Sequence, residues 1–347
     1  DTPLFFLYKN GKTDPPFPNK SPSSRNSRST IPFPSWSGDQ KIQGLVYTET
    51  DKNLQISCPQ ISCNSGLWQC LFSSDLGIIQ MQSPTVEVHS HISTPIAPKK
   101  PQIQAASFLG SLPINSLLPH IAISKTCDFR IEQGKVSIFS DKTPSIVLDA
   151  LTGHILVQEK SLSGKIQANT EQKDLHGTIF IESNWVLDTS LEVKATLTHF
   201  PVEGADALLS KAQPHYRGYL TDAIGPVLDL QCHIKIAQEE CLATLQVQSA
   251  NIEAHIQTEL KENELTLSSP ASLRVSLSPE FLEKAKKTHT YLQAIEFNAP
   301  FALSISLDQL HIPKRNTDIA FTEAAFEGRV ETKPYLLSDL TLGCKGI

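Results

Sequence analysis

Apolar and polar residues alternate with a period of two through much of the second half of the chain. In the clearest run, single polar residues separate five apolar ones: Leu228, Leu230, Cys232, Ile234 and Ile236. Similar runs recur over 191–197, 245–247, 252–256, 273–277 and 301–307. Successive side chains of a β-strand point to opposite faces of the sheet, so each run predicts a strand with one apolar and one polar face.

Helical segments are few and short in the same region. The expected helices cover residues 203–211, 216–223 and 279–287. The last has the clearest start, because Ser278 can cap a helix whose first residue is Pro279. No long helix separates the strands, which favours an antiparallel meander over βαβ units. We therefore expect a mainly β protein, an elongated antiparallel sheet with short helices that cap it rather than cover it.

Proline-rich segments divide the chain. The stretch 14–30 is rich in proline and serine and carries basic residues, so we interpret residues 1–40 as a linker or loop. A second proline-rich joint at 94–101 separates a first β-rich block, 41–100, from the main sheet region, 101–347. Because the chain begins at Asp1, without methionine or a signal-like apolar stretch, we expect it to be part of a longer protein.

Composition and charge narrow the function classes. Hydrophobic residues make up 39% of the 347, enough to bury a core, and the formal net charge is −6. A nucleic-acid-binding protein needs a basic excess to neutralise phosphates, so no nucleic-acid partner is expected. No uninterrupted apolar run is long enough for a membrane-spanning helix.

Motifs of catalysis are missing from the sequence. It contains no phosphate loop, dinucleotide glycine fingerprint, nucleophile elbow or HExxH motif, and its carboxylates are scattered. His89 and His91 would share one face of a strand, but Glu87 is the only acidic residue nearby, so we expect no metal site. The sequence therefore predicts neither an enzyme nor a cofactor.

Cysteines are seven in number, which leaves at least one thiol unpaired within the chain. Cys58, Cys63 and Cys70 lie within one short block, with spacings unlike the tight pairs of zinc sites. If the chain is exported, we expect a disulfide to involve at least one of them; the alternative is that they are free structural cysteines.

Three stretches after residue 117 form a recognisable pattern: LPHIAISKTCDFRIEQGKVSIFSD (118–141), IVLDALTGHI (146–155) and LSGKIQAN (162–169). We interpret them as a strand, a turn at Gly134, a strand ending at Asp141, and two strands punctuated by Gly153 and Gly164. Two further phrases are FPVEGADALL (200–209) and AIGPVLDL (223–230), with a weaker one, LSPEF, at 277–281. Together they resemble the AsmA-like and TamB-like envelope proteins, over about two thirds of the chain.

The resemblance implies a long, curved sheet that forms a groove with an apolar inner face and has no catalytic residues. Such proteins are similar to bridge-like lipid transfer proteins. The implied partners are phospholipids, and the implied location is the bacterial periplasm or cell envelope. The implied membrane anchor would lie in a segment outside this chain.

On this interpretation, lipid contacts fall on the apolar series of the most regular strands. The predicted residues are Leu228, Leu230, Ile234, Ile252, Ala254, Ile256, Leu303, Ile305 and Leu307. The same alternation would also suit a β-sandwich in which a second sheet fills the apolar face. That alternative predicts a structural or adhesive protein that binds another protein.

Overall fold

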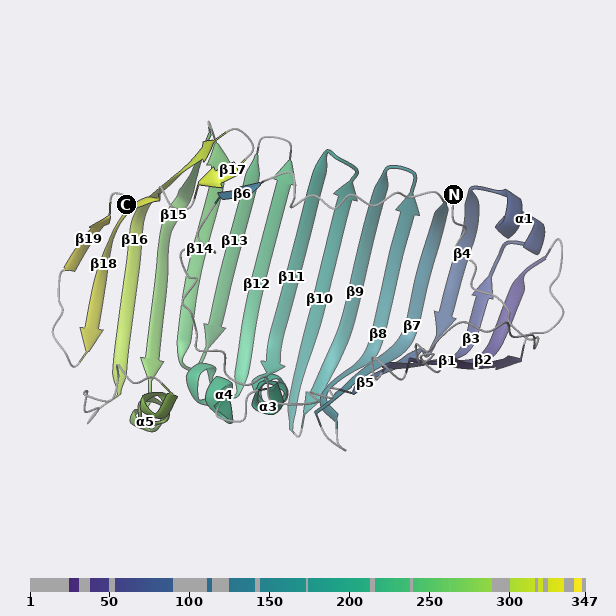
Figure 1. Ribbon diagram of the computed structural model, residues 1–347, viewed down its shortest axis with the longest axis horizontal. Coiled ribbons are helices and arrows are strands. Elements are labelled where there is room, and N and C mark those ends of the chain that lie inside the picture. The colour runs from purple at the N-terminus through teal and green to yellow at the C-terminus, as the bar shows by residue number, and fades with distance from the viewer. Residues whose placement is uncertain are drawn as a thin grey trace, which may run out of the picture.

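The computed structural model describes residues 25–30, 38–49, 54–89, 111–113, 125–140, 144–172, 174–212, 216–237, 240–261, 263–288, 300–315, 318–320, 324–333 and 340–344. These residues form a long, mainly β structure (Figure 1). The strands of its first part are β1 (Arg25–Thr30), β2 (Gln40–Glu49), β3 (Leu54–Cys63), β4 (Asp75–Gln82), β5 (Thr85–His89), β6 (Ser111–Pro113), β7 (Thr126–Phe139), β8 (Pro144–Gln158), β9 (Ser161–Gln172) and β10 (Leu175–Val186). Those of its second part are β11 (Ser190–Pro201), β12 (Val227–Ala237), β13 (Cys241–Ser249), β14 (Ile252–Lys261), β15 (Glu264–Leu277), β16 (Phe301–Arg315), β17 (Asp318–Ala320), β18 (Ala325–Lys333) and β19 (Leu340–Cys344). The described helices are α1 (Leu67–Phe72), α3 (Val202–Ala212), α4 (Tyr219–Ile224) and α5 (Pro279–Thr288).

The central part of the sheet is an antiparallel meander. From β7 to β16 every strand pairs with the next one along the chain, and the series continues from β16 to β18 and β19. This confirms the predicted fold class. The exceptions are β4 and β5, which both pair with β7 in parallel and with β3 on their other side.

The first β-rich block belongs to the same sheet as the main region. Strands β4 and β5, which precede the proline-rich joint, pair with β7, which follows it. Strands β3 and β2 continue the same sheet beyond β4 and β5. Residues 25–30, inside the stretch interpreted as a linker or loop, form β1 on the outer side of β2. The loop interpretation is therefore wrong for these six residues, which pair with β2 along one side of their backbone.

The turn predicted at Gly134 is also wrong. Gly134 lies within β7, in a region where the register to β8 shifts on both sides of the Gly134–Leu151 pair. Gln133 and Ala150 have positive φ angles of 52° and 49° there, which is typical of β-bulges that bend a strand without ending it. Gly153 and Gly164 likewise lie inside β8 and β9 rather than between strands.

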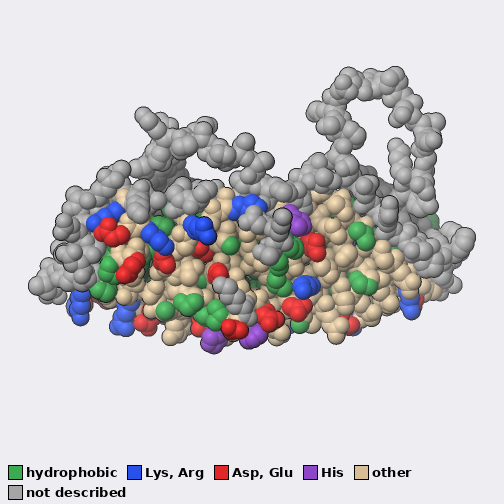
Figure 2. All heavy atoms as spheres, turned by 90° about the horizontal axis from the view of Figure 1, so that it is seen from below, with side chains coloured by type: hydrophobic (Ala, Val, Ile, Leu, Met, Phe, Trp, Pro, Cys, Tyr) green, Lys and Arg blue, Asp and Glu red, His purple; other side chains and the backbone are tan. Residues whose placement is uncertain are grey.

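Helices α3, α4 and α5 lie along one edge of the sheet, at the strand ends (Figure 1). They confirm the predicted capping helices to within a few residues, and the Ser278 hydroxyl accepts a hydrogen bond from the Phe281 backbone N–H at 3.2 Å. At Gly204 of α3, an added Cβ would overlap the carbonyl oxygen of Ser145, so this glycine lets the helix lie against the start of β8. Figure 2 looks onto this edge and shows an elongated, bowed band with charged and apolar side chains interspersed.

A buried carboxylate joins two of these helices. Asp206 of α3 is 7% exposed, and its two oxygens accept the backbone N–H groups of Gly218 and Leu220 at 2.8 and 2.7 Å. These N–H groups belong to the start of α4, where no intrahelical partner exists. The Asp206 side chain therefore caps α4 from a neighbouring helix.

We expect Asp206→Ala to lower the free energy of unfolding by about 1–3 kcal/mol, because two N–H groups lose their acceptor in a buried place. Urea denaturation measures this loss. Asp206→Asn is the matched control, because it keeps one acceptor oxygen and should lose clearly less. Equal losses for both variants would mean that the negative charge, and not the capping geometry, is what matters.

The tightest apolar cluster lies at the strand ends opposite the helices. It contains Ile236, Leu260, Leu265 and Ile312, which are 1–9% exposed, with Ala324 among the partly buried residues packed against it. The short strands β6 and β17 lie at this end, where β17 pairs with both β16 and β6 (Figure 1). At this end of the strands, in the β12–β16 region, the apolar side chains of the sheet are therefore packed together and closed off from solvent.

Candidate functional site

Strand registers align apolar residues into rows that run across the sheet. One row crosses β2, β3, β4 and every strand from β7 to β14. It consists of Ile42, Ile61, Met81, Ile131, Gly153, Ile166, Ile181, Ala195, Cys232, Leu245 and Ile256. Directly opposed residues of neighbouring strands point to the same face, so the row is a continuous apolar strip.

Two further rows run parallel to the first on the same face. One extends from β9 to β18: Ala168, Ile179, Leu197, Leu230, Val247, Ala254, Leu273, Ile305 and Val330. The other extends from β7 to β16: Cys127, Val157, Leu162, Trp185, Leu191, Ile236, Cys241, Leu260, Leu265 and Ile312. We call the surface made by the three rows the apolar face.

All nine residues predicted to contact lipid lie on the apolar face. Ile256 belongs to the first row, and Leu230, Ala254 and Ile305 belong to the second. The other five lie two residues from members of the rows on β12, β14 and β16 and so point to the same face. Their partners on neighbouring strands are also apolar, for example Val193, Val275 and Ala271.

The half of the apolar face that lies on β2 to β10 was not predicted from the sequence. There the bulges at Gln133 and Ala150 shift the phase of the alternation, and glycines replace some apolar residues. The signal that remains is local: Ile179 and Ile181, for example, still alternate with polar residues on β10.

Burial along the apolar face is uneven. Leu260 and Ile236, in the closed cluster, are 1% and 4% exposed, whereas Ile181 in the middle of the sheet is 38% exposed. The described strands connect through their pairings into one sheet, so none of them forms a second sheet over the face. Of the described helices, α3, α4 and α5 lie at the edge and do not extend over the middle of the face (Figure 1).

The opposite face of the sheet is polar, and ion pairs cross its strands. Asp128 binds Arg130 at 2.6 Å and His154 at 2.8 Å, and Lys165 lies 3.6 Å from Glu182. Hydrogen bonds from Arg130 hold the pKa of Asp128 below its usual value, and the nearby His154 acts in the same direction. We call this surface the polar face.

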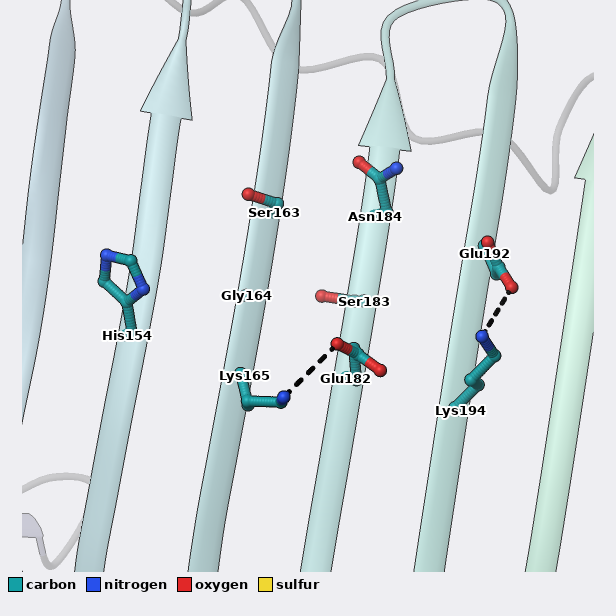
Figure 3. A pocket seen from close by; sticks show the side chains of 9 residues that line it. All are labelled: His154, Ser163, Gly164, Lys165, Glu182, Ser183, Asn184, Glu192 and Lys194. Carbon is teal, nitrogen blue, oxygen red and sulfur yellow. Dashed lines mark ion pairs between the residues drawn. The ribbon is translucent and has the colours of Figure 1, made fainter.

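A shallow depression of about 570 Å³ lies on the polar face over β8 to β11 (Figure 3). Its charged lining residues are His154, Lys165, Glu182, Glu192 and Lys194. Figure 3 shows Lys165 of β9 paired with Glu182 of β10, and Lys194 paired with Glu192 on β11 at 3.0 Å.

Glu192 also contacts His233 at 2.9 Å, outside the depression. Hydrogen bonds from Lys194 and then His233 lower the pKa of the Glu192 carboxyl. A carboxyl whose pKa is lowered in this way is ionised near neutral pH and has no proton to donate, so this arrangement does not suit a general acid.

The cysteines of the first block are not joined to each other. Cys58 and Cys63 are free, so neither takes part in the disulfide expected for an exported chain, and the Cys70 side chain lies outside the described part of the structure. The Cys58 thiol is 1% exposed and donates to the backbone oxygens of Gln60 and Gln82, and burial raises its pKa. A buried thiol of raised pKa packs as a small apolar group and is a poor nucleophile.

Metal binding finds no support among the described residues, where no group of three or more His, Cys, Asp or Glu side chains could hold an ion. His89 stacks on Phe139 with ring centroids 4.5 Å apart, and its Nε2 atom lies 3.9 Å from Glu87. His91, its expected companion, lies outside the described residues.

Comparisons of the chain with protein-family models, curated proteins and solved structures found no match. Among the helices that the structure describes, none combines the length and the hydropathy needed to cross a bilayer.

Proposed function

We propose that this chain is a non-enzymatic lipid-handling protein whose apolar face holds the acyl chains of phospholipids. The observation that carries the proposal is the first row, which runs from Ile42 on β2 to Ile256 on β14 and lacks a side chain only at Gly153, beside which the Ile131 side chain lies. With neighbouring strands about 4.8 Å apart, this row is roughly 50 Å long. A soluble protein rarely exposes apolar patches of more than a few hundred Å², so a face of this extent needs a cover.

Acyl chains provide such a cover without specific polar contacts. Each methylene group that leaves water contributes about 0.8 kcal/mol, so one long chain lying across several strands binds well. The rows are mainly aliphatic and, apart from the Trp185 indole and three thiols, offer no hydrogen-bond partners that would fix a ligand in one register, which suits movement along the face. The charged polar face remains in water and keeps the two sides of the sheet distinct.

The resemblance to the AsmA-like and TamB-like proteins supports phospholipid as the lipid and the bacterial envelope as the location. On this proposal the protein works in the periplasm, in transport or outer-membrane homeostasis. A segment outside this chain provides its membrane anchor.

The test is to purify the chain without detergent from a bacterial host and to analyse the extracted lipid by mass spectrometry. We expect phospholipid in at least a one-to-one ratio with the protein, and uptake of fluorescent phospholipid from vesicles by delipidated protein. A protein that carries no lipid and takes up none would overturn the proposal. A tightly bound protein partner in place of lipid would favour the structural or adhesive alternative.

A further inference from the structure

Helix α1 displays two aromatic side chains to solvent. Trp68 is 61% exposed and Phe72 is 68% exposed; only one other large apolar side chain in the described part of the chain, Ile181, stands out in this way. The two residues are four positions apart on one helix, and their ring centroids are 4.3 Å apart. They form one compact aromatic patch.

The helix that carries the patch is firmly attached at its base. Two hydrogen bonds join Asn64 to Ile78. The backbone N–H of Asn64 donates to the carbonyl oxygen of Ile78 at 3.1 Å, and the Oδ1 atom of Asn64 accepts from the backbone N–H of Ile78 at 2.6 Å. The hydroxyl of Ser65, which is 1% exposed, donates to Leu76 O at 2.9 Å. The two residues that precede the glycine before α1 are thus bonded to β4, the strand that follows the helix, so the base of the helix is tied to the sheet while Trp68 and Phe72 remain exposed.

The patch is also free of charge and lies beside one end of the apolar face. The six residues of α1, LWQCLF, include no acidic or basic side chain. The helix connects β3 to β4, and Ile61 and Met81 of these strands belong to the first apolar row. Figure 1 shows α1 near the end of the sheet that is farthest from β19.

The size of the patch argues against a protein partner. A buried aromatic side chain covers about 150–250 Å², so the exposed parts of these two rings amount to roughly 300 Å². A stable protein interface needs about 800 Å² from each partner. A bilayer interface has no such threshold, and Trp and Phe are side chains that insert at the level of the lipid headgroups.

We propose that α1 docks this end of the sheet onto a phospholipid bilayer by inserting Trp68 and Phe72 into its interface. The inference rests on the proposed function for its purpose, since docking brings the end of the apolar face to the lipid that it takes up or releases. The contact is apolar, so it requires neither anionic lipid nor low salt.

The experiment is flotation of the purified chain with vesicles of neutral phosphatidylcholine at 0.15 and 0.5 M salt. The Debye length is about 8 Å at the lower concentration and shorter at the higher one, so interactions between exposed charges are increasingly screened. We expect the wild type to float, and Trp68→Ser/Phe72→Ser to lose at least about tenfold in partitioning, as expected when two interfacial anchors are removed. Gln69→Ser, an exposed change on the same helix, should float like the wild type. A blue shift of tryptophan fluorescence on vesicle addition should disappear in Trp68→Phe.

Three results would overturn the docking proposal. They are equal flotation of the double variant and the wild type, binding of the wild type to anionic vesicles alone with loss at high salt, and conversion of a dimer to a monomer by the double variant. The lipid that co-purifies with each variant separates this proposal from the proposed function. If the double variant no longer floats but keeps its co-purified lipid, docking by α1 is supported. If the wild type floats but never carries lipid, docking by α1 is still supported and the proposed lipid-handling function is overturned.

Discussion

Ile256→Glu combined with Ile305→Glu should strip most of the co-purifying lipid from the protein while leaving it folded. The two residues lie in different rows of the apolar face, on β14 and β16, and neither is fully buried. A carboxylate placed against acyl chains loses its hydration, at a cost of several kcal/mol, which exceeds the gain from a few buried methylenes. In the partly open face, the same carboxylate can turn toward water once lipid is gone, so the protein should lose little stability.

The matched control adds the same two charges to the other side of the same region. Gln246→Glu and Ser304→Glu lie on the polar face, where Gln246 faces His255 and Ser304 faces Arg274. This variant should keep the lipid load of the wild type. Lipid per chain, from extraction and mass spectrometry, and urea unfolding curves are the measurements. If the Ile256/Ile305 variant unfolds, the face is a closed core of the sandwich type; if it folds and keeps its lipid, the acyl chains lie elsewhere.

The sequence predicts those features of this structure that depend on residues close together in the chain. The alternation over β12 to β16 identifies both the strands and the face, because apolar residues keep every second position through 228–236, even where the register to β11 shifts between Leu230 and Leu228. The capping helices are equally local, as the contact between Ser278 and the Phe281 N–H illustrates.

Other features depend on contacts between distant residues. The parallel pairing of β4 and β5 with β7 joins segments separated by the proline-rich joint, and no local pattern contains that information. The rows of the apolar face depend on register, which the strand connections and the bulges at Gln133 and Ala150 set together. For that reason the nine residues predicted to contact lipid could be assigned to individual strands from the sequence, but their alignment with Ile42, Ile61 and Ile181 could not.

The aromatic patch on α1 illustrates a third case. From sequence, an isolated tryptophan is best interpreted as core or interface packing. The structure shows Trp68 exposed, because the hydrogen bonds of Asn64 and Ser65 to β4 fix the helix base and direct its outer side away from the sheet.

Leu260→Ala should destabilise the protein strongly, although Leu260 lies on the same apolar face as Ile181. Leu260 is 1% exposed and packs within the closed cluster with Ile236, Leu265 and Ile312. Truncation leaves a cavity that the ends of four strands cannot easily collapse to fill, so we expect a loss of about 2–5 kcal/mol in the free energy of unfolding. Urea denaturation of the delipidated protein measures it without a contribution from bound ligand.

Ile181→Ala is the matched comparison, since it removes a similar apolar volume from the open middle of the face. Ile181 is 38% exposed, so its truncation should cost under about 1.5 kcal/mol in delipidated protein. The amount of bound lipid should show the opposite order, falling more for Ile181→Ala than for Leu260→Ala, because in the proposed function acyl chains lie on Ile181 and not on the closed cluster. Equal losses of stability for the two variants would show that the middle of the face is as tightly packed as its end, and that no open surface remains there for lipid.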